Sequence, residues 1–280
     1  MKNLFLIVLT FILVSCARQT VNVYTPQPAN TVIVKDEGDA GINVSYFGNG
    51  EKHAAEKNLI SKGIALQSRV VVYNKFFIEG SFSSLNERSD GEIFESSSNQ
   101  RTFRSTAKYN NKEIGIGKIV KINNSGSSNF LFSAGYGFTN YRNQFEIINN
   151  NSIKYPTFNF ENNHIYFGFL YQLNTGIFTY QVGFKHSQIN FKNITTNNET
   201  YFVEDIKELK NYTQGFKGTT QFFNDFGISP FKESKWLSIH AGFSFSNRIN
   251  VESRFKSRVI GGNLSLMASP QGLLKRRKVG

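Results

Sequence analysis

The chain has 280 residues, of which 39% are hydrophobic, 15% aromatic and 19% charged, and its formal net charge is +12. Both the hydrophobic and the charged fractions lie below those of an average soluble domain, whereas Phe and Tyr are abundant. This composition argues against a helical protein and favours short alternating β-strands. The single cysteine excludes an intramolecular disulfide and any multi-cysteine metal site.

A short apolar run opens the chain. Lys2 precedes the run at 4–14, which is followed by a small residue and Cys16. Because a helix needs about 20 apolar residues to cross a bilayer, we interpret 1–15 as a removable signal peptide. The four residues from Leu13 to Cys16 resemble the lipobox of bacterial lipoproteins. The resemblance implies diacylglycerol and an N-acyl chain such as palmitate on the cysteine; an ordinary secretory signal with a chance cysteine is the alternative.

Residues 16–40 include Pro26 and Pro28 in a mixed polar sequence. We predict a lipidated extended tether between the anchor and the folded domain. In bacterial lipoproteins an aspartate directly after the cysteine is associated with inner-membrane retention, and here that residue is Ala17. The resemblance therefore implies a lipid anchor in the outer membrane, with the N-terminus on the periplasmic side.

From Gly41 onward the apolar residues recur with the period of two that is typical of strands. In 130–139, Phe, Phe, Ala, Tyr and Phe alternate with Leu, Ser, Gly, Gly and Thr. One face of this strand is therefore apolar, and the other carries mostly small or polar residues. Such stretches have the length at which a tilted strand crosses a bilayer. We predict strands near 41–48, 62–73, 75–86, 101–122, 129–147, 161–173, 177–192, 213–226, 236–248 and 256–268.

This pattern resembles outer-membrane barrels, whose outer face is apolar and whose lumen is polar. The predicted fold class is therefore all-β, a transmembrane antiparallel up-and-down β-barrel of about ten strands that spans 41–268. A lipid-tethered soluble barrel or sandwich in the periplasm is the alternative.

The predicted connections alternate in length. Short turns are expected at Asn74, 123–128, 174–176 and 228–235, and longer loops at 49–61, 87–100, 148–160 and 193–212. Outer-membrane barrels keep short turns on the periplasmic side, so an even strand number places both termini there, as a periplasmic anchor requires. Asn110 and Asn111 could form a hairpin turn that splits 101–122. We expect a bulge there instead, because a turn would make the strand number odd.

The sequence carries no recognisable catalytic or metal-binding constellation. The four histidines are scattered, and none stands at ligand spacing with another histidine or an acid. We predict no catalytic residue, no metal site and no cofactor besides the lipid on Cys16. Polar side chains that face the lumen are expected at Arg69, His164, Gln181, Lys185 and His240.

Two further segments could contact a partner. The long loop at 193–212 contains a segment, 201–211, with a helical spacing of apolar residues from 203 onward. A short helix there could cap the barrel or form a docking site for a partner. The segment 269–280 is a basic periplasmic tail that is either disordered or in contact with an acidic partner or anionic head groups. Its cations are Lys275, Arg276, Arg277 and Lys278.

These features together resemble a bacterial outer-membrane β-barrel lipoprotein. We predict a non-enzymatic accessory subunit of an outer-membrane complex for protein assembly, secretion or transport. Its expected partners are outer-membrane lipid and a larger outer-membrane protein complex, but not nucleic acid, which an exported lipoprotein rarely meets. A small-solute pore with anion preference and a periplasmic lipid-tethered ligand-binding β-barrel are the alternatives.

Overall fold

A computed structural model of the chain describes residues 21–24, 28, 30–49, 56–96, 99–123, 127–149, 152–175, 177–197, 217–229, 237–246, 255–257 and 260–269. The predicted signal peptide, Cys16, the helix predicted within 201–211 and the basic residues at 275–278 lie outside the described residues. Among the described residues, no helix is long and apolar enough to cross a membrane.

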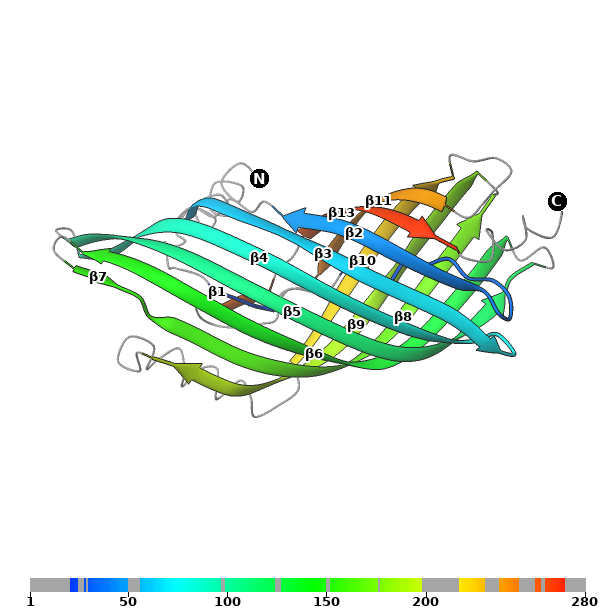
Figure 1. Ribbon diagram of the computed structural model, residues 1–280, viewed down its shortest axis with the longest axis horizontal. Helices are drawn as coiled ribbons and strands as arrows, with labels where there is room; N and C mark the ends of the chain where they lie inside the picture. Colours follow the sequence, from blue (N-terminus) through cyan, green and yellow to red (C-terminus); the bar gives the residue numbers. More distant parts are fainter. Residues whose placement is uncertain are drawn as a thin grey trace, which may run out of the picture.

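Ten antiparallel strands of the described residues close into a barrel (Figure 1). In order around the wall they are β2 (Ala40–Asn49), β3 (Glu56–Tyr73), β4 (Phe76–Ser96), β5 (Asn99–Lys121), β6 (Ser128–Asn149), β8 (Thr157–Asn174), β9 (Phe178–Thr196), β10 (Lys217–Ile228), β11 (Leu237–Ser246) and β13 (Ile260–Ala268). Pairing of β13 with β2 closes the ring. The predicted ten-stranded up-and-down barrel is confirmed.

Three short strands complete the described structure. β7 (Ser152–Lys154) folds back on the end of β6. β1 (Val21–Tyr24) pairs in parallel with β12 (Phe255–Ser257), which precedes β13. The pairing of β1 with β12 holds a piece of the N-terminal segment next to the barrel.

The barrel has a tight-turn end and a long-strand end. At the tight-turn end, Asn74 and Lys75 have φ of 45° and 65°, the positive values of a two-residue type I′ hairpin turn, as predicted at Asn74. At the other end, β4, β5 and β6 reach 21, 23 and 22 residues. That is about twice the length a tilted strand needs to cross a bilayer, so these strands protrude (Figure 1).

Two predictions about the long-strand end are wrong. The expected loop at 87–100 is absent, because β4 and β5 stay paired up to Ser96 and Asn99. No bulge occurs at Asn110 and Asn111, which pair with β4 and β6 in unbroken register. Where side chains are described, as at Arg88, Lys108 and Arg142, the outward positions of these protruding strands are polar, so the apolar alternation that marks a membrane strand fades while the backbone ladder continues.

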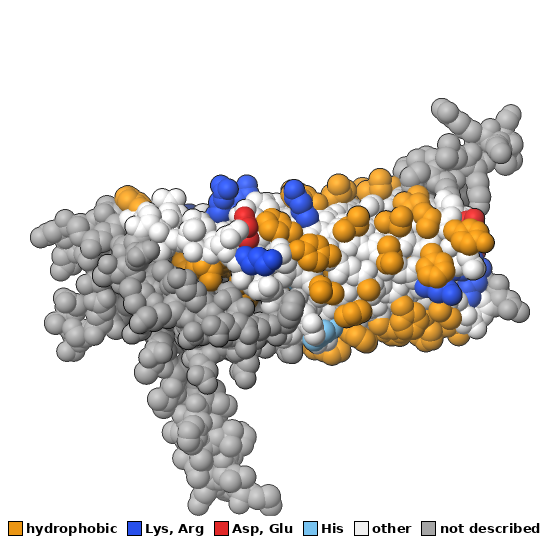
Figure 2. Space-filling model, turned by 90° about the horizontal axis from the view of Figure 1, so that it is seen from below, with side chains coloured by type: hydrophobic (Ala, Val, Ile, Leu, Met, Phe, Trp, Pro, Cys, Tyr) orange, Lys and Arg blue, Asp and Glu red, His pale blue; other side chains and the backbone are white. Residues whose placement is uncertain are grey.

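A belt of large apolar side chains surrounds the barrel near the tight-turn end. Every one of the ten strands contributes, and Phe132, Phe167 and Phe243 on β6, β8 and β11 are 47%, 56% and 56% exposed. Figure 2 shows these side chains spread over one part of the wall, with Lys and Arg at the borders. A soluble protein rarely exposes so large an apolar surface, whereas a transmembrane barrel presents such a band to lipid.

Beyond this belt, in the protruding half, apolar side chains point inward and polar side chains point outward. Inward side chains of the protruding strands form a buried apolar cluster, in which Tyr141 stacks on Phe160 with ring centroids 4.3 Å apart. The other members include Leu85, Tyr109, Phe145, Phe158, Ile189 and Phe191. Outward positions on the same part of β6 are Asn140, Arg142 and Gln144. The protruding half is therefore built like a water-soluble barrel with its own core.

The belt yields a first prediction. Replacing Phe167 by Arg places a charge in the hydrocarbon and should destabilise the folded barrel by about 2 to 4 kcal/mol if the position lies near the midplane. The matched control is Gln144→Arg, an exposed outward position of the protruding half, which should change stability by less than about 0.5 kcal/mol. Both free-energy changes are measured by urea unfolding in detergent, with the folded and unfolded forms distinguished by their migration in a gel. Equal costs for the two variants would contradict a lipid-facing belt.

Candidate functional site: a lumen threaded by the N-terminal segment

The N-terminal segment lies inside the barrel. Gln67 Nε2 donates to Pro28 O at 2.7 Å, and Arg69 donates to Asn30 O at 3.1 Å and to Val32 O at 2.7 Å. Across the lumen, Gln181 Nε2 on β9 donates to Thr31 O at 2.8 Å. The polar inner wall thus binds carbonyl groups in the second half of the segment predicted as a tether.

The contacts also give the direction of the segment. As its residue number rises from Pro28 to Lys35, its partner moves from Gln67 on β3 to Lys75 in the turn that follows β3. The segment thus runs parallel to β3, toward the tight-turn end. Residues 21–24 belong at the opposite end, because their partner β12 ends only three positions before β13 begins there.

The first described residues, Val21–Tyr24, therefore lie at the end opposite to the one that strand parity predicts for the N-terminus. Strand parity placed both termini at the tight-turn end, on the assumption that the chain enters β2 directly. The chain instead passes through the lumen from the long-strand end, then reverses into β2 at Ala40. The parity of the strand number gives the ends at which the wall starts and finishes. It contains no information about a segment that passes through the lumen before the first strand.

Apolar contacts seal the lumen around this segment. Val32 and Val34 are 0% and 1% exposed, and they pack with Val71, Phe77, Ile119, Leu131, Leu170, Phe223 and Met267. These side chains come from the inner faces of β3, β4, β5, β6, β8, β10 and β13. The cluster joins the segment to most of the wall, so the described residues fill this level of the barrel.

An ionic clasp holds the segment at the tight-turn end. Asp36 Oδ1 accepts hydrogen bonds from Lys75 Nζ at 2.5 Å and Lys121 Nζ at 2.9 Å. Beyond it, Gly38 has φ of 78°, a conformation that glycine adopts without strain, and its N–H donates to Val71 O at 2.9 Å. The clasp and turn therefore fix the reversal into β2.

The clasp predicts a specific pH behaviour. Hydrogen bonds from Lys75 and then Lys121 lower the pKa of Asp36 from 3.8 to about 2. The clasp should therefore contribute stability above the carboxyl's ordinary pKa of 3.8 and lose it as pH falls through about 2. Lys75→Asn removes the stronger donor while keeping a residue that tolerates positive φ. An NMR titration of the Asp36 carboxyl should then show a higher pKa; an unchanged titration would mean that the clasp is absent in solution.

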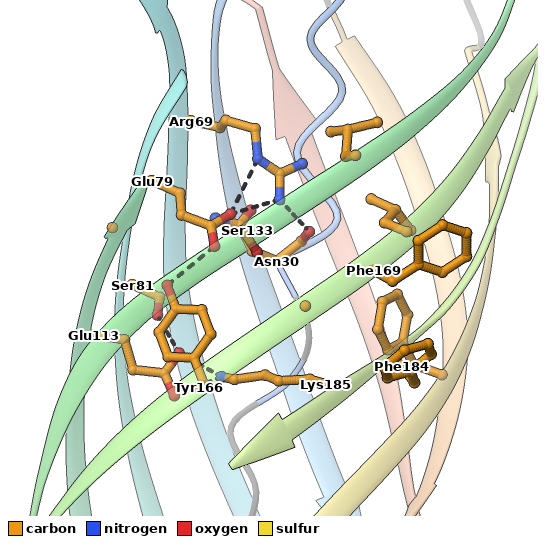
Figure 3. Close-up of a pocket in the computed structure, with 15 residues that line it drawn as sticks. Asn30, Arg69, Glu79, Ser81, Glu113, Ser133, Tyr166, Phe169, Phe184 and Lys185 are labelled. Atoms are coloured by element: carbon orange, nitrogen blue, oxygen red, sulfur yellow. Dashed lines mark hydrogen bonds and ion pairs between the residues drawn. The ribbon is translucent and has the colours of Figure 1, made fainter. Parts of the chain in front are cut away.

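Buried charges form a network in the middle of the lumen (Figure 3). Arg69 Nη2 lies 2.7 Å from Glu79 Oε2, and Lys185 Nζ lies 2.5 Å from Glu113 Oε1. Tyr166 connects the two pairs, because its hydroxyl donates to Glu79 Oε1 at 3.0 Å and Lys185 Nζ lies 4.5 Å from its ring centroid. The two cations are thus balanced by two carboxylates, as buried charges require.

Glycines make room for the large members of this network. A side chain at Gly115 would meet the hydroxyl of Tyr166 at 2.2 Å, and one at Gly135 would meet its ring at 2.5 Å. The bare backbone of β5 and β6 therefore lets the ring lie against the wall. A small cavity of about 30 Å³ remains beside Asn30, Arg69 and Lys185, which is room for one or two water molecules.

The residues predicted to face the lumen are all buried, at 9% exposure or less. Arg69 and Gln181 hold the threaded segment, Lys185 and His164 meet Glu113, and His240 lies on β11. Glu79 and Glu113 pair with Arg69 and Lys185, two of the cations on which the predicted anion preference depended. Sequence reasoning missed both acids, although each stands on the inner face of its strand.

His240 has partners that the sequence analysis did not foresee. Its Nδ1 lies 2.6 Å from Asp225 Oδ2 on β10, and its Nε2 lies 2.8 Å from Ser238 Oγ. This is the order of a Ser-His-Asp relay, but all three side chains are buried within the wall. Continuous ladders with β10 and β13 pair the flanking backbone of β11. The chain of hydrogen bonds satisfies buried polar groups.

No family model and no curated protein matches this chain. Among solved structures, the translocator domain of the autotransporter NalP from Neisseria meningitidis aligns over 83% of this chain and 88% of its own length, at 10% identity and a TM-score of 0.46. The outer membrane protease OmpT from Escherichia coli aligns over 86% and 98%, at 8% identity and a TM-score of 0.43.

The COG4313 outer membrane channel from Pseudomonas putida F1 aligns over 87% of this chain and 99% of its own, at 9% identity and a TM-score of 0.36. With such low identities and TM-scores, these likenesses carry no argument about activity. The function of the closed ten-stranded barrel has to be inferred from its own geometry.

Proposed function

We propose that the chain is a non-enzymatic outer-membrane lipoprotein whose barrel is closed and acts through its surfaces, as an accessory subunit of an outer-membrane complex. The observation that carries this proposal is the threaded segment. A barrel whose lumen holds its own N-terminal segment has no described passage for a solute, which argues against the pore. The exposed apolar belt on all ten strands argues against a soluble periplasmic barrel.

The same geometry revises the proposed position of the lipid. If short turns face the periplasm, as in known outer-membrane barrels, Val21–Tyr24 lies on the outer side. Cys16 is five residues before Val21, a distance of at most about 17 Å for extended chain. The acyl chains on Cys16 would then enter the outer leaflet, and the protein would be a surface lipoprotein anchored beside its own barrel.

Affinity purification of the full chain in mild detergent tests the subunit role, together with conductance in a planar bilayer. We expect a stoichiometric protein partner and no stable single-channel current. The candidate contact segments are tested by deleting 274–280 or 201–211, either of which should weaken co-purification if it binds the partner. Steady conductance of the intact protein without any co-purifying partner would contradict the proposal and favour the pore.

A further inference from the structure

Three cations gather on the outer wall of the protruding half. Lys108 and Lys112 on β5 and Arg142 on β6 all point outward and are exposed. The strand register places Lys108 directly opposite Arg142. Like charges in directly opposed positions destabilise a sheet, so this arrangement is unfavourable for folding alone.

Neighbouring acids do not neutralise this group. Glu146 forms its ion pair with Arg104 at 3.3 Å, and Glu161 accepts a hydrogen bond from Asn193. Within the described part of the chain, neither acid has an ion pair with Lys108, Lys112 or Arg142. The net positive charge of the cluster is therefore left facing outward.

The cluster lies directly at the border of the apolar belt. Ile114 on β5 is 64% exposed and belongs to the belt. Lys112 is the next outward residue on β5 toward the long-strand end, and the register places it opposite Phe138 on β6. Lys108 is four residues further along β5, about 13 Å at 3.3 Å per residue. Strand tilt reduces this to about 10 Å of height, so the cations extend from the border of the belt through a head-group layer of about 5 to 8 Å and slightly beyond it.

Two amides lie between the cations. Asn110 and Asn140 are opposed in the register, between the Lys108–Arg142 pair and Lys112. Asn110 Oδ1 accepts a hydrogen bond from Ser84 Oγ at 2.9 Å, which orients its Nδ2 as the remaining donor. The wall therefore offers a guanidinium, two ammonium groups and amide donors, a set that suits phosphate oxygens.

We propose that Lys108, Lys112 and Arg142 form a binding site for the phosphate groups of an anionic lipid in the leaflet at the long-strand end. The apolar positions at Ile114 and Phe138 would contact its acyl chains, while the cations and amides bind its head group. A water-soluble polyanion could use the cations but not the apolar border. The site needs only membrane insertion, so it stands or falls separately from the subunit role.

Native mass spectrometry of the full-length protein tests this site, with diphosphoryl lipid A, phosphatidylglycerol and phosphatidylcholine as probes. The intact protein should retain the anionic lipids in preference to phosphatidylcholine. Because one surface cation contributes about a 5-fold effect, Lys108→Gln with Arg142→Gln should weaken retention about 25-fold. Lys108→Arg, which keeps the charge, should bind like the original protein.

The matched control is Lys192→Gln, which removes an outward cation from β9, where the register places it opposite Glu161. It should leave lipid retention unchanged. Heat-modifiable migration checks folding, and Arg142→Gln alone replaces the double variant if that fails to fold. Undiminished retention by the charge-removing variant, an equal loss in Lys192→Gln, or equal competition by inorganic phosphate would each overturn the proposal.

Discussion

Replacing Arg69 by Met is expected to destabilise the folded barrel by about 3 to 5 kcal/mol, because it leaves the carboxylate of Glu79 buried without its cation. Arg69 is 3% exposed, and it also donates to Asn30 O and Val32 O of the threaded segment. Urea unfolding in detergent measures the loss. The segment should lose protection from hydrogen exchange in the same variant.

The double variant Arg69→Met with Glu79→Gln separates the two contributions. Removing the unpaired charge should recover part of the stability, because a neutral amide is less costly to bury than a carboxylate. Arg142→Met, an exposed outward arginine, is the control and should change stability by less than about 0.5 kcal/mol. If Arg69→Met were as stable as Arg142→Met, the buried network would not exist as described.

Replacing Gly41 by Val should displace the threaded segment. A Cβ at this position would lie 2.5 Å from Val32 Cγ1, which is too close for any real contact. The excess volume should cost about 1 to 3 kcal/mol or expel residues 30–34 from the wall. Hydrogen exchange measured by mass spectrometry should show faster exchange of this segment, while the strands of the wall stay protected.

A matched control and a rescue accompany this variant. A Cβ at Gly261, also on the inner wall, would meet only Ser244 Oγ at 3.5 Å, so Gly261→Val should leave the segment protected. Val32→Ala combined with Gly41→Ala removes volume from the threaded segment and adds it to β2. This double variant should restore the protection of the segment from hydrogen exchange. Unchanged exchange in Gly41→Val would contradict the packing of the segment against β2.

The wall of the barrel could be predicted from the sequence, because one face of each strand contacts lipid. That contact selects apolar residues at every second position, and the strands at 130–139 and 165–173 were recognised by it. The protruding ends, such as 87–96 on β4, were missed for the same physical reason. Described outward side chains beyond the belt, such as Arg142 and Gln144 on β6, are polar, so the apolar alternation disappears although the hydrogen-bond ladder continues.

The contents of the lumen were harder to predict. Arg69 and Lys185 were assigned to the inner face by strand alternation, but their partners Glu79 and Glu113 depend on which strands are neighbours around the ring. The short segment 31–34 is Thr-Val-Ile-Val, which reads equally well as an exposed tether or a buried strand. Only closure of the barrel around it provides the apolar surface that decides between them.

The central claim is that the N-terminal segment passes through the lumen, and tag accessibility on intact cells tests it most directly. One epitope is inserted before Val21, a second between Ser96 and Asn99 at the long-strand end, and a third between Asn123 and Ser127 at the tight-turn end. Threading predicts that the first epitope binds antibody on the same side of the membrane as the second, and that the third is reached only from the opposite side. Co-accessibility of the first epitope with the third would contradict it.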